Sequence, residues 1–162
     1  MSAERNGVSV LFICRGNLCR SPMAMVLLQS RLEKEGLVER VAVDSAGYYD
    51  WAPFPREAHP FARRAVQELC GSDMLAAHSA RSWSAEQVGR ATLVLVAEEW
   101  MRADFPSGRV MTFKAFGGEK GDVEDPYGGD YTEFLTCAKE IQHLLEAGMP
   151  RIRVLLDLPG RP

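Results

Sequence analysis

The sequence predicts an α/β fold in which a central four-stranded parallel sheet is flanked by helices on both faces, as in doubly wound domains. Short apolar segments rich in β-branched residues alternate along the chain with longer segments of helical periodicity. One of them, residues 91–97 (ATLVLVA), is apolar throughout, which is typical of a strand buried on both faces of a parallel sheet. No repeat or linker divides the chain, so we expect one domain over residues 1–162, with the flavodoxin-like strand order 2-1-3-4.

The individual elements follow from hydrophobic periodicity and from residues that begin or end helices. Strands are expected at residues 8–13, 40–44, 91–97 and 109–112. Helices are expected at residues 23–35, 60–70, 98–104 and 131–146. Pro22 suits the first position of a helix, with Ser21 before it as the N-cap, and Gly36 suits the end of that helix.

The connecting segments are marked by glycine, proline and acidic residues. Residues 45–47 (Ser-Ala-Gly) are expected to form a turn after the second strand. Residues 48–60, which are aromatic and proline-rich, and residues 117–129, which are rich in glycine and acids, are expected to be loops. The tail, residues 151–162, carries an apolar patch at 154–158 to which the sequence assigns no role.

Composition limits the class of protein. The chain of 162 residues is 46% hydrophobic and 25% charged, which is ordinary for a globular core. A net charge of −3 disfavours nucleic-acid partners, and no apolar run approaches the ~20 residues of a membrane span. The N-terminal residues lack the apolar segment of a signal peptide. Because two of the four cysteines stand in one loop, we expect a protein of the reducing cytoplasm.

Residues 8–22 (VSVLFICRGNLCRSP) pass from an apolar strand through a short loop to a helix N-terminus. Loop N–H groups and the positive end of the helix dipole form a binding site for an anion. Cys14 opens the loop, and a cysteine attacks as its thiolate, which a helix N-terminus and a guanidinium favour. Arg20 follows, and its guanidinium can donate to two phosphate oxygens in parallel. The pattern Cys-x5-Arg therefore predicts a nucleophile that handles phosphate.

Three further residues suit the same loop. Ser21 can donate a hydrogen bond to the Cys14 sulfur and hold it as an anion. Gly16 allows the backbone to turn closely around the bound group. Asn17 tolerates the left-handed conformation that turns successive N–H groups into one nest.

The signature of the low-molecular-weight protein tyrosine phosphatases closely resembles one segment of this chain, Cys14-Arg15-Gly16-Asn17-Leu18-Cys19-Arg20-Ser21-Pro22. The resemblance extends over about residues 8–146. It implies that Cys14 forms a phosphocysteine, that Arg20 and the other loop residues bind the phosphoryl group, and that no cofactor takes part. It also implies that Cys19 forms a reversible disulfide with Cys14 that protects the nucleophile from over-oxidation; an inert Cys19 is the alternative.

Hydrolysis also needs an acid for the leaving oxygen and a base for the attacking water. One carboxyl group can serve both steps in turn. Asp125, in Glu-Asp-Pro-Tyr-Gly-Gly about a hundred residues after Cys14, resembles the general acid that the family carries in Asp-Pro-Tyr or Asp-Pro-Phe. An ordinary Asp-Pro turn is the alternative. The nearby acids Asp122, Glu124 and Asp130 are expected to be solvated.

The resemblance assigns supporting roles as well. It implies that Trp51 and Tyr127 line the substrate cleft together with Leu18, and residues 48, 49 and 54 are further aromatic candidates for this wall. The family's Ser-Ala-Gly and His-x-Ala-Arg motifs are similar to the segments that begin at Ser45 and His78, which implies that these two side chains support the loop asparagine. An ordinary half-buried histidine is the alternative for His78.

The remaining reactive residues are given simpler roles. Cys70 and Cys137 fall in predicted helices and are expected to pack there. His59 and His143 have no ligand-like neighbours in the sequence, so no metal site is expected. Arg15 is either a positive group at the pocket rim that favours acidic substrates or merely an exposed side chain.

We predict a protein-tyrosine phosphatase that acts on a phosphorylated protein, with a tyrosine kinase among the candidates, as a monomer or weak dimer. A protein-arginine phosphatase is the alternative, because Asp-Pro-Tyr-Gly-Gly is similar to the Asp-Pro-Phe-Gly-Gly of that branch; Leu18, however, stands where that branch has threonine. An arsenate reductase would need further cysteines in a mobile segment. A non-catalytic phosphopeptide binder would not need Cys14, Arg20 and Asp125 together.

Overall fold

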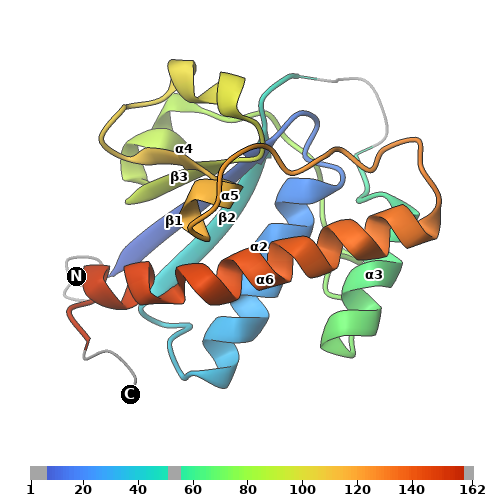
Figure 1. Ribbon diagram of the computed structural model, residues 1–162, viewed down its shortest axis with the longest axis horizontal. Coiled ribbons are helices and arrows are strands. Elements are labelled where there is room, and N and C mark those ends of the chain that lie inside the picture. Colours follow the sequence, from blue (N-terminus) through green and yellow to red (C-terminus); the bar gives the residue numbers. More distant parts are fainter. Residues whose placement is uncertain (1–6, 51–55, 159–162) are drawn as a thin grey trace.

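A four-stranded parallel sheet forms the centre of the computed structural model, which describes residues 7–50 and 56–158. Its strands are β1 (Val8–Cys14), β2 (Val41–Gly47), β3 (Leu93–Val96) and β4 (Val110–Thr112). They lie in the order β2-β1-β3-β4, which confirms the predicted order 2-1-3-4 (Figure 1). Two predicted wall residues, Trp51 and Phe54, fall outside the described residues.

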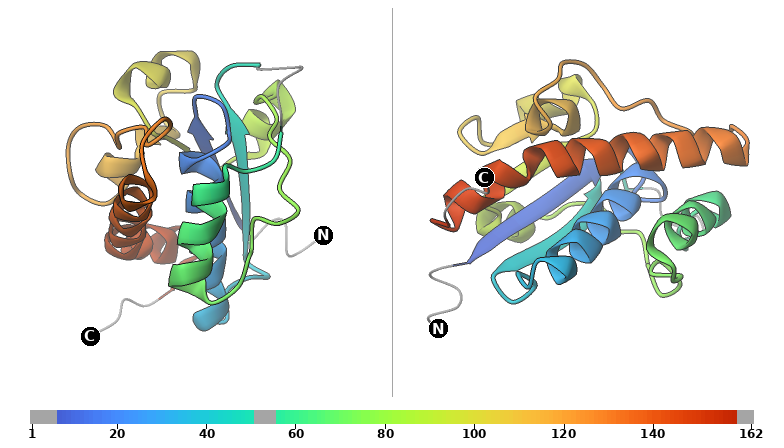
Figure 2. Two further views of the ribbon diagram at one scale, coloured as in Figure 1. Left: turned by 90° about the vertical axis from the view of Figure 1, so that its right-hand side faces the viewer. Right: turned by 60° about the horizontal axis from the view of Figure 1, so that its bottom comes forward.

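Helices cover both faces of the sheet (Figure 2). On one face lie α2 (Arg20–Lys34), α3 (Pro60–Cys70), α5 (Phe113–Phe116) and α6 (Tyr131–Leu155). On the other lie α4 (Ala85–Arg90) and the 3-10 helix η1 (Glu99–Asp104). Side chains of β1 alternate between the two cores, because Val10 and Phe12 face the first layer and Leu11 and Ile13 face the second. None of the described helices is both long and apolar enough to span a membrane.

The start of α2 differs from the prediction in a way that matters for the site. The helix begins at Arg20 with Cys19 as its N-cap, so Ser21 is not the cap and Pro22 is the third helical residue. No side chain caps this end, and its first turn carries no acidic residue. Its first N–H groups are therefore left for another partner, such as an anion.

Strand β2 is longer than predicted, because residues 45–47 continue the ladder instead of turning. Gly47 lies opposite Cys14 in the register of β1 and β2. A side chain at Gly47 would crowd the next loop, since a Cβ atom there would lie 3.1 Å from the Gly16 carbonyl carbon and 3.2 Å from the Arg15 oxygen. The end of β2 thus supports the backbone that follows β1.

Helix α6 does not end at Glu146 as predicted but continues to Leu155, through Pro150. The local stop signals are overridden by packing, since Met149 and Ile152 are buried on the sheet side. Gly148 lets α6 approach Phe116 so closely that a Cβ atom would overlap the ring. Part of the tail is therefore helix, with Ile152 and Leu156 buried and Val154 and Leu155 exposed.

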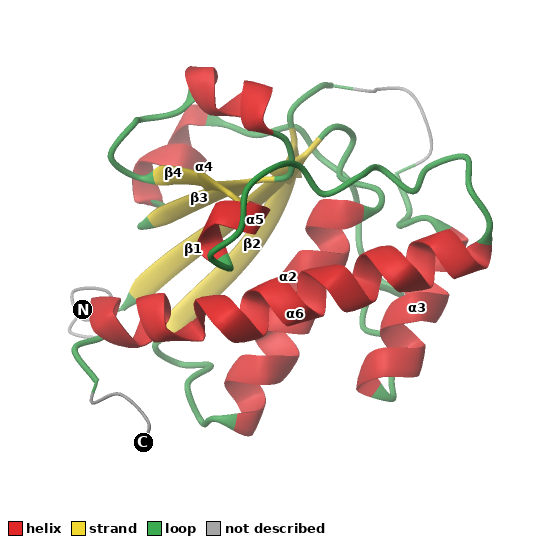
Figure 3. Ribbon diagram, viewed as in Figure 1, coloured by secondary structure: helices red, strands yellow, loops and turns green. Residues whose placement is uncertain are grey.

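Two short helices, α4 and α5, were not predicted (Figure 3). Their caps are nevertheless visible in the sequence. Ser84 and Gln87 form a capping box at α4, and the Thr112 side chain accepts a hydrogen bond from the Ala115 amide at α5. Both helices are shorter than two turns, which leaves too little periodicity for detection from sequence.

Candidate active site

Cys14 ends β1 at the carboxyl edge of the sheet, where parallel α/β folds bind ligands. Its sulfur lies 3.0 Å from the Ser21 hydroxyl oxygen. That oxygen accepts a hydrogen bond of 2.8 Å from the Asn17 amide, so its own proton is free for the sulfur, which is closer than the Ala46 carbonyl at 3.4 Å. Ser21 can thus stabilise negative charge on Cys14.

Asn17 organises the interior of the anion loop, which we define as residues 14–21. Its φ of 59° is left-handed and its side chain is fully buried. The amide nitrogen donates to the hydroxyls of Ser21 and Ser45 at 2.8 and 3.0 Å. The amide oxygen accepts from the Arg81 backbone N–H at 3.2 Å. All the hydrogen-bonding groups of this side chain are therefore occupied in holding one loop conformation.

His78 supports the same residue from the other side. Its Nε2 lies 2.9 Å from the Asn17 carbonyl oxygen, and because a carbonyl only accepts, Nε2 carries the proton. Burial lowers the pKa of His78, which keeps the ring neutral near pH 7. The structure thus brings Ser45 and His78 together at Asn17, where the sequence predicted them.

Arg20 is almost completely buried, at 1% exposure. One terminal nitrogen donates to the Val123 carbonyl at 2.7 Å, and the other donates to Glu98 at 2.8 Å and lies 3.5 Å from Asp125. Burial opposes its charge, but the negative charges of Cys14, Asp125 and Glu98 outweigh that effect and raise its pKa. Among the described residues, Arg20 Nε is the one buried side-chain nitrogen or oxygen without a partner. A phosphoryl oxygen bound in the loop would satisfy it.

Glu98 is a site residue that the sequence analysis missed. Its carboxylate accepts hydrogen bonds from Arg15 Nε and a terminal Arg15 nitrogen, both at 2.8 Å, from Arg20 at 2.8 Å and from the Trp100 indole at 2.9 Å. Burial opposes its ionisation, but these donors lower the pKa of Glu98 to about 2. Its position, just after the buried strand β3 at the carboxyl edge of the sheet, was the available signal.

Arg15 is therefore not an unpaired cation at the rim. Its side chain is 49% exposed, yet two of its nitrogens engage Glu98 in parallel hydrogen bonds. Its pKa is raised by the same carboxylate. Arg15 thus helps to position Glu98, which in turn binds Arg20.

Asp125 reaches the same site from the loop before α6, where one carboxylate oxygen accepts from the Tyr127 amide at 3.1 Å. Its side chain is 33% exposed. The competing acids lie elsewhere. Asp122 accepts from the Glu99 amide and Asp130 caps α6, while Glu124 is exposed. Of these four acids, Asp125 alone lines a cavity with Cys14.

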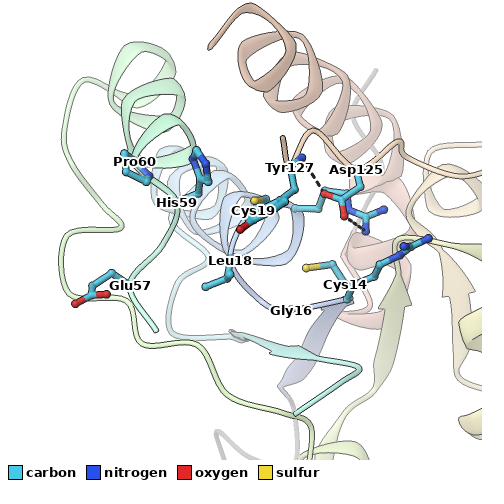
Figure 4. A pocket seen from close by; sticks show the side chains of 11 residues that line it. Cys14, Gly16, Leu18, Cys19, Glu57, His59, Pro60, Asp125 and Tyr127 are labelled. Atoms are coloured by element: carbon cyan, nitrogen blue, oxygen red, sulfur yellow. Dashed lines mark hydrogen bonds and ion pairs between the residues drawn. The ribbon is translucent and has the colours of Figure 1, made fainter. Parts of the chain in front are cut away.

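This cavity has a volume of about 520 Å³. Figure 4 shows side chains that line it. Its lining includes five residues of the anion loop, Cys14, Arg15, Gly16, Cys19 and Arg20. Asp125 lies on the side opposite Leu18, across from Cys14. Its outer wall is formed by Leu18, Glu57, His59, Pro60 and Tyr127. Tyr48 and Tyr49 do not line it.

His59 is a second residue of the site that the sequence analysis missed. Its ring stacks on Phe134 at 4.4 Å between centroids and meets the edge of Tyr127 at 5.8 Å. Its Nδ1 accepts from the Phe61 amide at the start of α3, so Nε2 carries the proton of the neutral ring. Burial lowers the pKa of His59. The wall therefore combines aromatic faces with one N–H donor.

The cysteines differ in their surroundings. Cys19 is 4% exposed and lines the cavity with Cys14, and burial together with the neighbouring charge of Cys14 raises its pKa. Cys137 is buried in the core, where burial raises its pKa to about 12, and Cys70 packs against the same core. All four thiols are free. Cys19 is thus a protonated thiol in the same cavity as Cys14.

A family model described as low molecular weight phosphotyrosine protein phosphatase matches residues 9–154. The chain belongs to this family. A probable low molecular weight protein-tyrosine-phosphatase EpsP from Ralstonia nicotianae is 33% identical over 151 residues, 91% of this chain and 97% of that protein. A protein-arginine-phosphatase from Bacillus subtilis is also 33% identical, over 145 residues, 85% of this chain and 92% of that protein.

Solved structures of both tyrosine and arginine phosphatases resemble this chain. A low molecular weight protein tyrosine phosphatase from T. tengcongensis has a TM-score of 0.80 at 30% identity, covering 90% of this chain and 99% of that chain. YwlE arginine phosphatase from Geobacillus stearothermophilus has a TM-score of 0.77 at 29% identity, covering 96% and 99%. Overall similarity therefore does not separate tyrosine from arginine phosphatases here, and the pocket wall must be considered.

The described part of the phosphatase contains no group of three His, Cys, Asp or Glu side chains that could hold a metal ion. What it does bring together is a thiol, a buried guanidinium and a carboxyl group around one cavity. Such a set can attack a phosphorus atom, neutralise the charge of the transferring group and move a proton.

Proposed function

We propose that this protein hydrolyses phosphotyrosine in proteins through a phosphocysteine intermediate. The Cys14 thiolate attacks phosphorus while the Asp125 carboxyl group gives its proton to the tyrosine oxygen as the P–O bond breaks. Asp125, now ionised, takes a proton from a water molecule whose oxygen attacks the phosphocysteine. The S–P bond then breaks, which releases inorganic phosphate and regenerates the Cys14 thiolate.

Other residues act on charge and position. Arg20 and the backbone amides of residues 15–19 bind the phosphoryl oxygens, and Ser21 stabilises the sulfur as it leaves phosphorus. The observation that carries this proposal is the meeting of Cys14, Arg20 and Asp125 at one cavity, with Arg20 Nε buried and unpartnered. A phosphopeptide binder would have no use for the acid at Asp125.

The wall of the cavity supports tyrosine as the substrate residue. Leu18 packs against the core beneath the wall and offers no hydrogen bond to a guanidinium. Tyr127 and His59 present ring faces and edges to an aromatic ring. Burying a phosphoguanidinium against Leu18 would leave N–H groups unsatisfied, which costs about 1–3 kcal/mol per group.

One observation favours a protein-arginine phosphatase as the second candidate. Glu57 lines the outer wall, and its carboxylate has no ion pair or hydrogen bond among the described residues. A carboxylate there could accept hydrogen bonds from a phosphorylated guanidinium group. The two candidates thus depend on different side chains of the same wall.

The deciding experiment measures kcat/KM for one peptide that carries either phosphotyrosine or phosphoarginine. We expect the parent to favour phosphotyrosine by at least about tenfold. Leu18→Thr should move the ratio toward phosphoarginine, whereas Glu57→Gln should lower only the phosphoarginine rate. A parent that prefers phosphoarginine, with Glu57→Gln abolishing that preference, would replace the first candidate with the second.

We further propose that the protein works in the cytoplasm on phosphorylated proteins, including a tyrosine kinase, as a monomer or weak dimer. Free thiols at all four cysteines suit a reducing compartment. Fractionation of cells that produce the protein, and its mass in solution, test these statements.

A further inference from the structure

Three aromatic side chains gather beside the anion loop, outside the cavity. Tyr48 meets Tyr49 and Trp100 edge to face, at 5.0 and 4.8 Å between ring centroids, and Tyr49 lies 6.0 Å from Trp100. We call these three residues the aromatic patch. Tyr49 and Trp100 remain 42% and 41% exposed, although large aromatic side chains are usually well buried.

The aromatic patch is hydrogen-bonded directly to the anion loop. The amide of Tyr48 donates to the Cys14 carbonyl at 2.7 Å, and the amide of Tyr49 donates to the Arg15 carbonyl at 3.0 Å. The Trp100 indole donates to Glu98, the carboxylate that also binds Arg20. The patch therefore adjoins Cys14 and Arg15, which line the cavity.

The distribution of exposed apolar side chains points to the same side of the molecule. Among the described residues, six large hydrophobic side chains are exposed. Three are aromatic, and all three, Tyr49, Trp100 and Tyr127, lie around the catalytic mouth. The aliphatic Val154 and Leu155 lie instead at the far end of α6. Exposed aromatic side chains are enriched where proteins bind one another.

Charged groups at the border of the aromatic patch are already engaged. Arg15 is paired with Glu98, Arg102 is paired with Glu99, and the Asp104 carboxylate accepts a hydrogen bond from the Tyr48 hydroxyl. An acidic residue laid on the patch would lose hydration without gaining a free positive partner, because Arg15 and Arg102 are both already paired. An apolar side chain would gain contact area at no such cost.

We propose that the aromatic patch binds an apolar side chain of the substrate protein itself, one to three residues from the phosphotyrosine in its sequence. This inference rests on the proposed function, because a phosphotyrosine in the cavity brings its own polypeptide across the adjoining surface. The patch thus selects substrates by an apolar residue near the phosphorylated one. Tyr49 and Trp100 are specificity-determining residues outside the cavity.

The test compares two phosphotyrosine peptides that differ only at the three positions on either side of the phosphotyrosine, occupied by leucine in one and serine in the other. The measured quantity is the ratio of their kcat/KM values. Burial of one leucine side chain against the rings should give the parent a ratio of about five to ten. Tyr49→Ser should bring the ratio close to one. Val154→Ser, which removes an exposed apolar side chain at the other end of the molecule, should leave it unchanged.

Trp100→Phe separates selection from support of Glu98, since phenylalanine keeps a ring but loses the indole donor. The rate on both peptides should fall together while the ratio is retained. A parent that hydrolyses both peptides equally well would overturn the aromatic patch and leave the proposed function standing, as would a ratio unaffected by Tyr49→Ser. A parent that hydrolyses neither peptide would overturn the phosphotyrosine function and the patch with it.

Discussion

Apart from Arg15, the anion loop, residues 14–21, buries its polar side chains among hydrogen-bond partners, whereas the acid loop, residues 117–129, exposes nearly all of its own. Asn17, Arg20 and Ser21 are each at most 1% exposed. In the acid loop only Val123 and Pro126 are buried. Folding therefore fixes the proposed nucleophile and phosphate site in advance, while the proposed acid lies on a more exposed segment.

A single buried residue joins the two loops. Val123 donates through its amide to the Ala97 carbonyl at 3.0 Å and accepts from Arg20 at 2.7 Å through its own carbonyl. Arg20 thus holds the base of the acid loop and also belongs to the proposed phosphate site. The buried cation Arg20 therefore contacts both loops, although one loop is largely buried and the other is largely exposed.

Removal of the nucleophile should have the largest effect. Cys14→Ser is expected to lower kcat on p-nitrophenyl phosphate by about 10⁴-fold or more, because a serine hydroxyl is not ionised near neutral pH. Calorimetric binding of inorganic phosphate should persist, since Arg20 and the loop amides remain. Cys70→Ser is the matched control and should keep full activity. Turnover by Cys14→Ser within tenfold of the parent would contradict the assignment.

The acid loop is tested by Asp125→Asn, which keeps the shape but removes the proton. We expect a loss of about 10²–10³-fold for aryl phosphates with poor leaving groups, and a much smaller loss for good ones, because only a poor leaving group needs the proton. Rates measured across a series of aryl phosphates give the dependence of rate on the pKa of the leaving group. Asp122→Asn, in the same loop, should leave this dependence as in the parent. An equal loss for every leaving group would show that Asp125 is not the general acid.

Glu98→Gln should weaken the ion pair that positions Arg20 between the two loops. We expect kcat/KM to fall by about tenfold to a hundredfold, since misplacement of Arg20 weakens phosphate positioning. Stability should fall by about 2–4 kcal/mol near pH 7, because the buried cation loses its carboxylate. Chemical denaturation measures the second effect, and Glu99→Gln, which affects only an exposed pair, is the control.

The pH dependence of that loss has a definite sign. The pKa of Glu98 is lowered from 4.5 to about 2 in the folded protein, so its carboxylate stabilises the fold above pH 4.5 and this contribution is lost as the pH falls toward 2. The difference in free energy of unfolding between parent and Glu98→Gln should therefore shrink over that range. A difference that stays constant from pH 7 to pH 2 would contradict the role of Glu98.

Much of the anion loop could be predicted from sequence because its determinants are local. Cys14, Asn17, Arg20 and Ser21 stand within eight residues, between a strand and a helix that periodicity reveals. The doubly wound parallel sheet also followed from the alternation of strands and helices, and the order 2-1-3-4 is the flavodoxin-like order of such sheets. The position of Asp125 depended on the family motif, since an Asp-Pro turn alone has no chemical meaning.

The contacts that the sequence did not reveal are distant along the chain. Glu98 lies 83 positions from Arg15 and 78 from Arg20, and only the pairing of β1 with β3 in the folded sheet brings them together. His59 was dismissed because its neighbours, Tyr127 and Phe134, come from another part of the chain. The extension of α6 past Pro150 has the same origin, since packing against Phe116 outweighs a local stop signal.

A smaller effect is expected from two substitutions of Asn17, which test the backbone conformation of the anion loop. Asn17→Gly and Asn17→Ala both remove the hydrogen bonds to Ser21, Ser45 and the Arg81 amide, which should cost about 1–3 kcal/mol of stability and about tenfold in kcat. Alanine should cost about 1 kcal/mol more than glycine, because only alanine is strained at a φ of 59°.

Denaturant titration of the two Asn17 variants beside Tyr127→Ala completes the comparison of the loops. Tyr127 is 65% exposed in the acid loop, so its loss should change stability by less than about 0.5 kcal/mol. If Tyr127→Ala were as destabilising as Asn17→Ala, the two loops would not differ in how firmly they are held. If alanine and glycine at position 17 were equally stable, the hydrogen bonds of Asn17, and not its left-handed backbone, would account for its place in the loop.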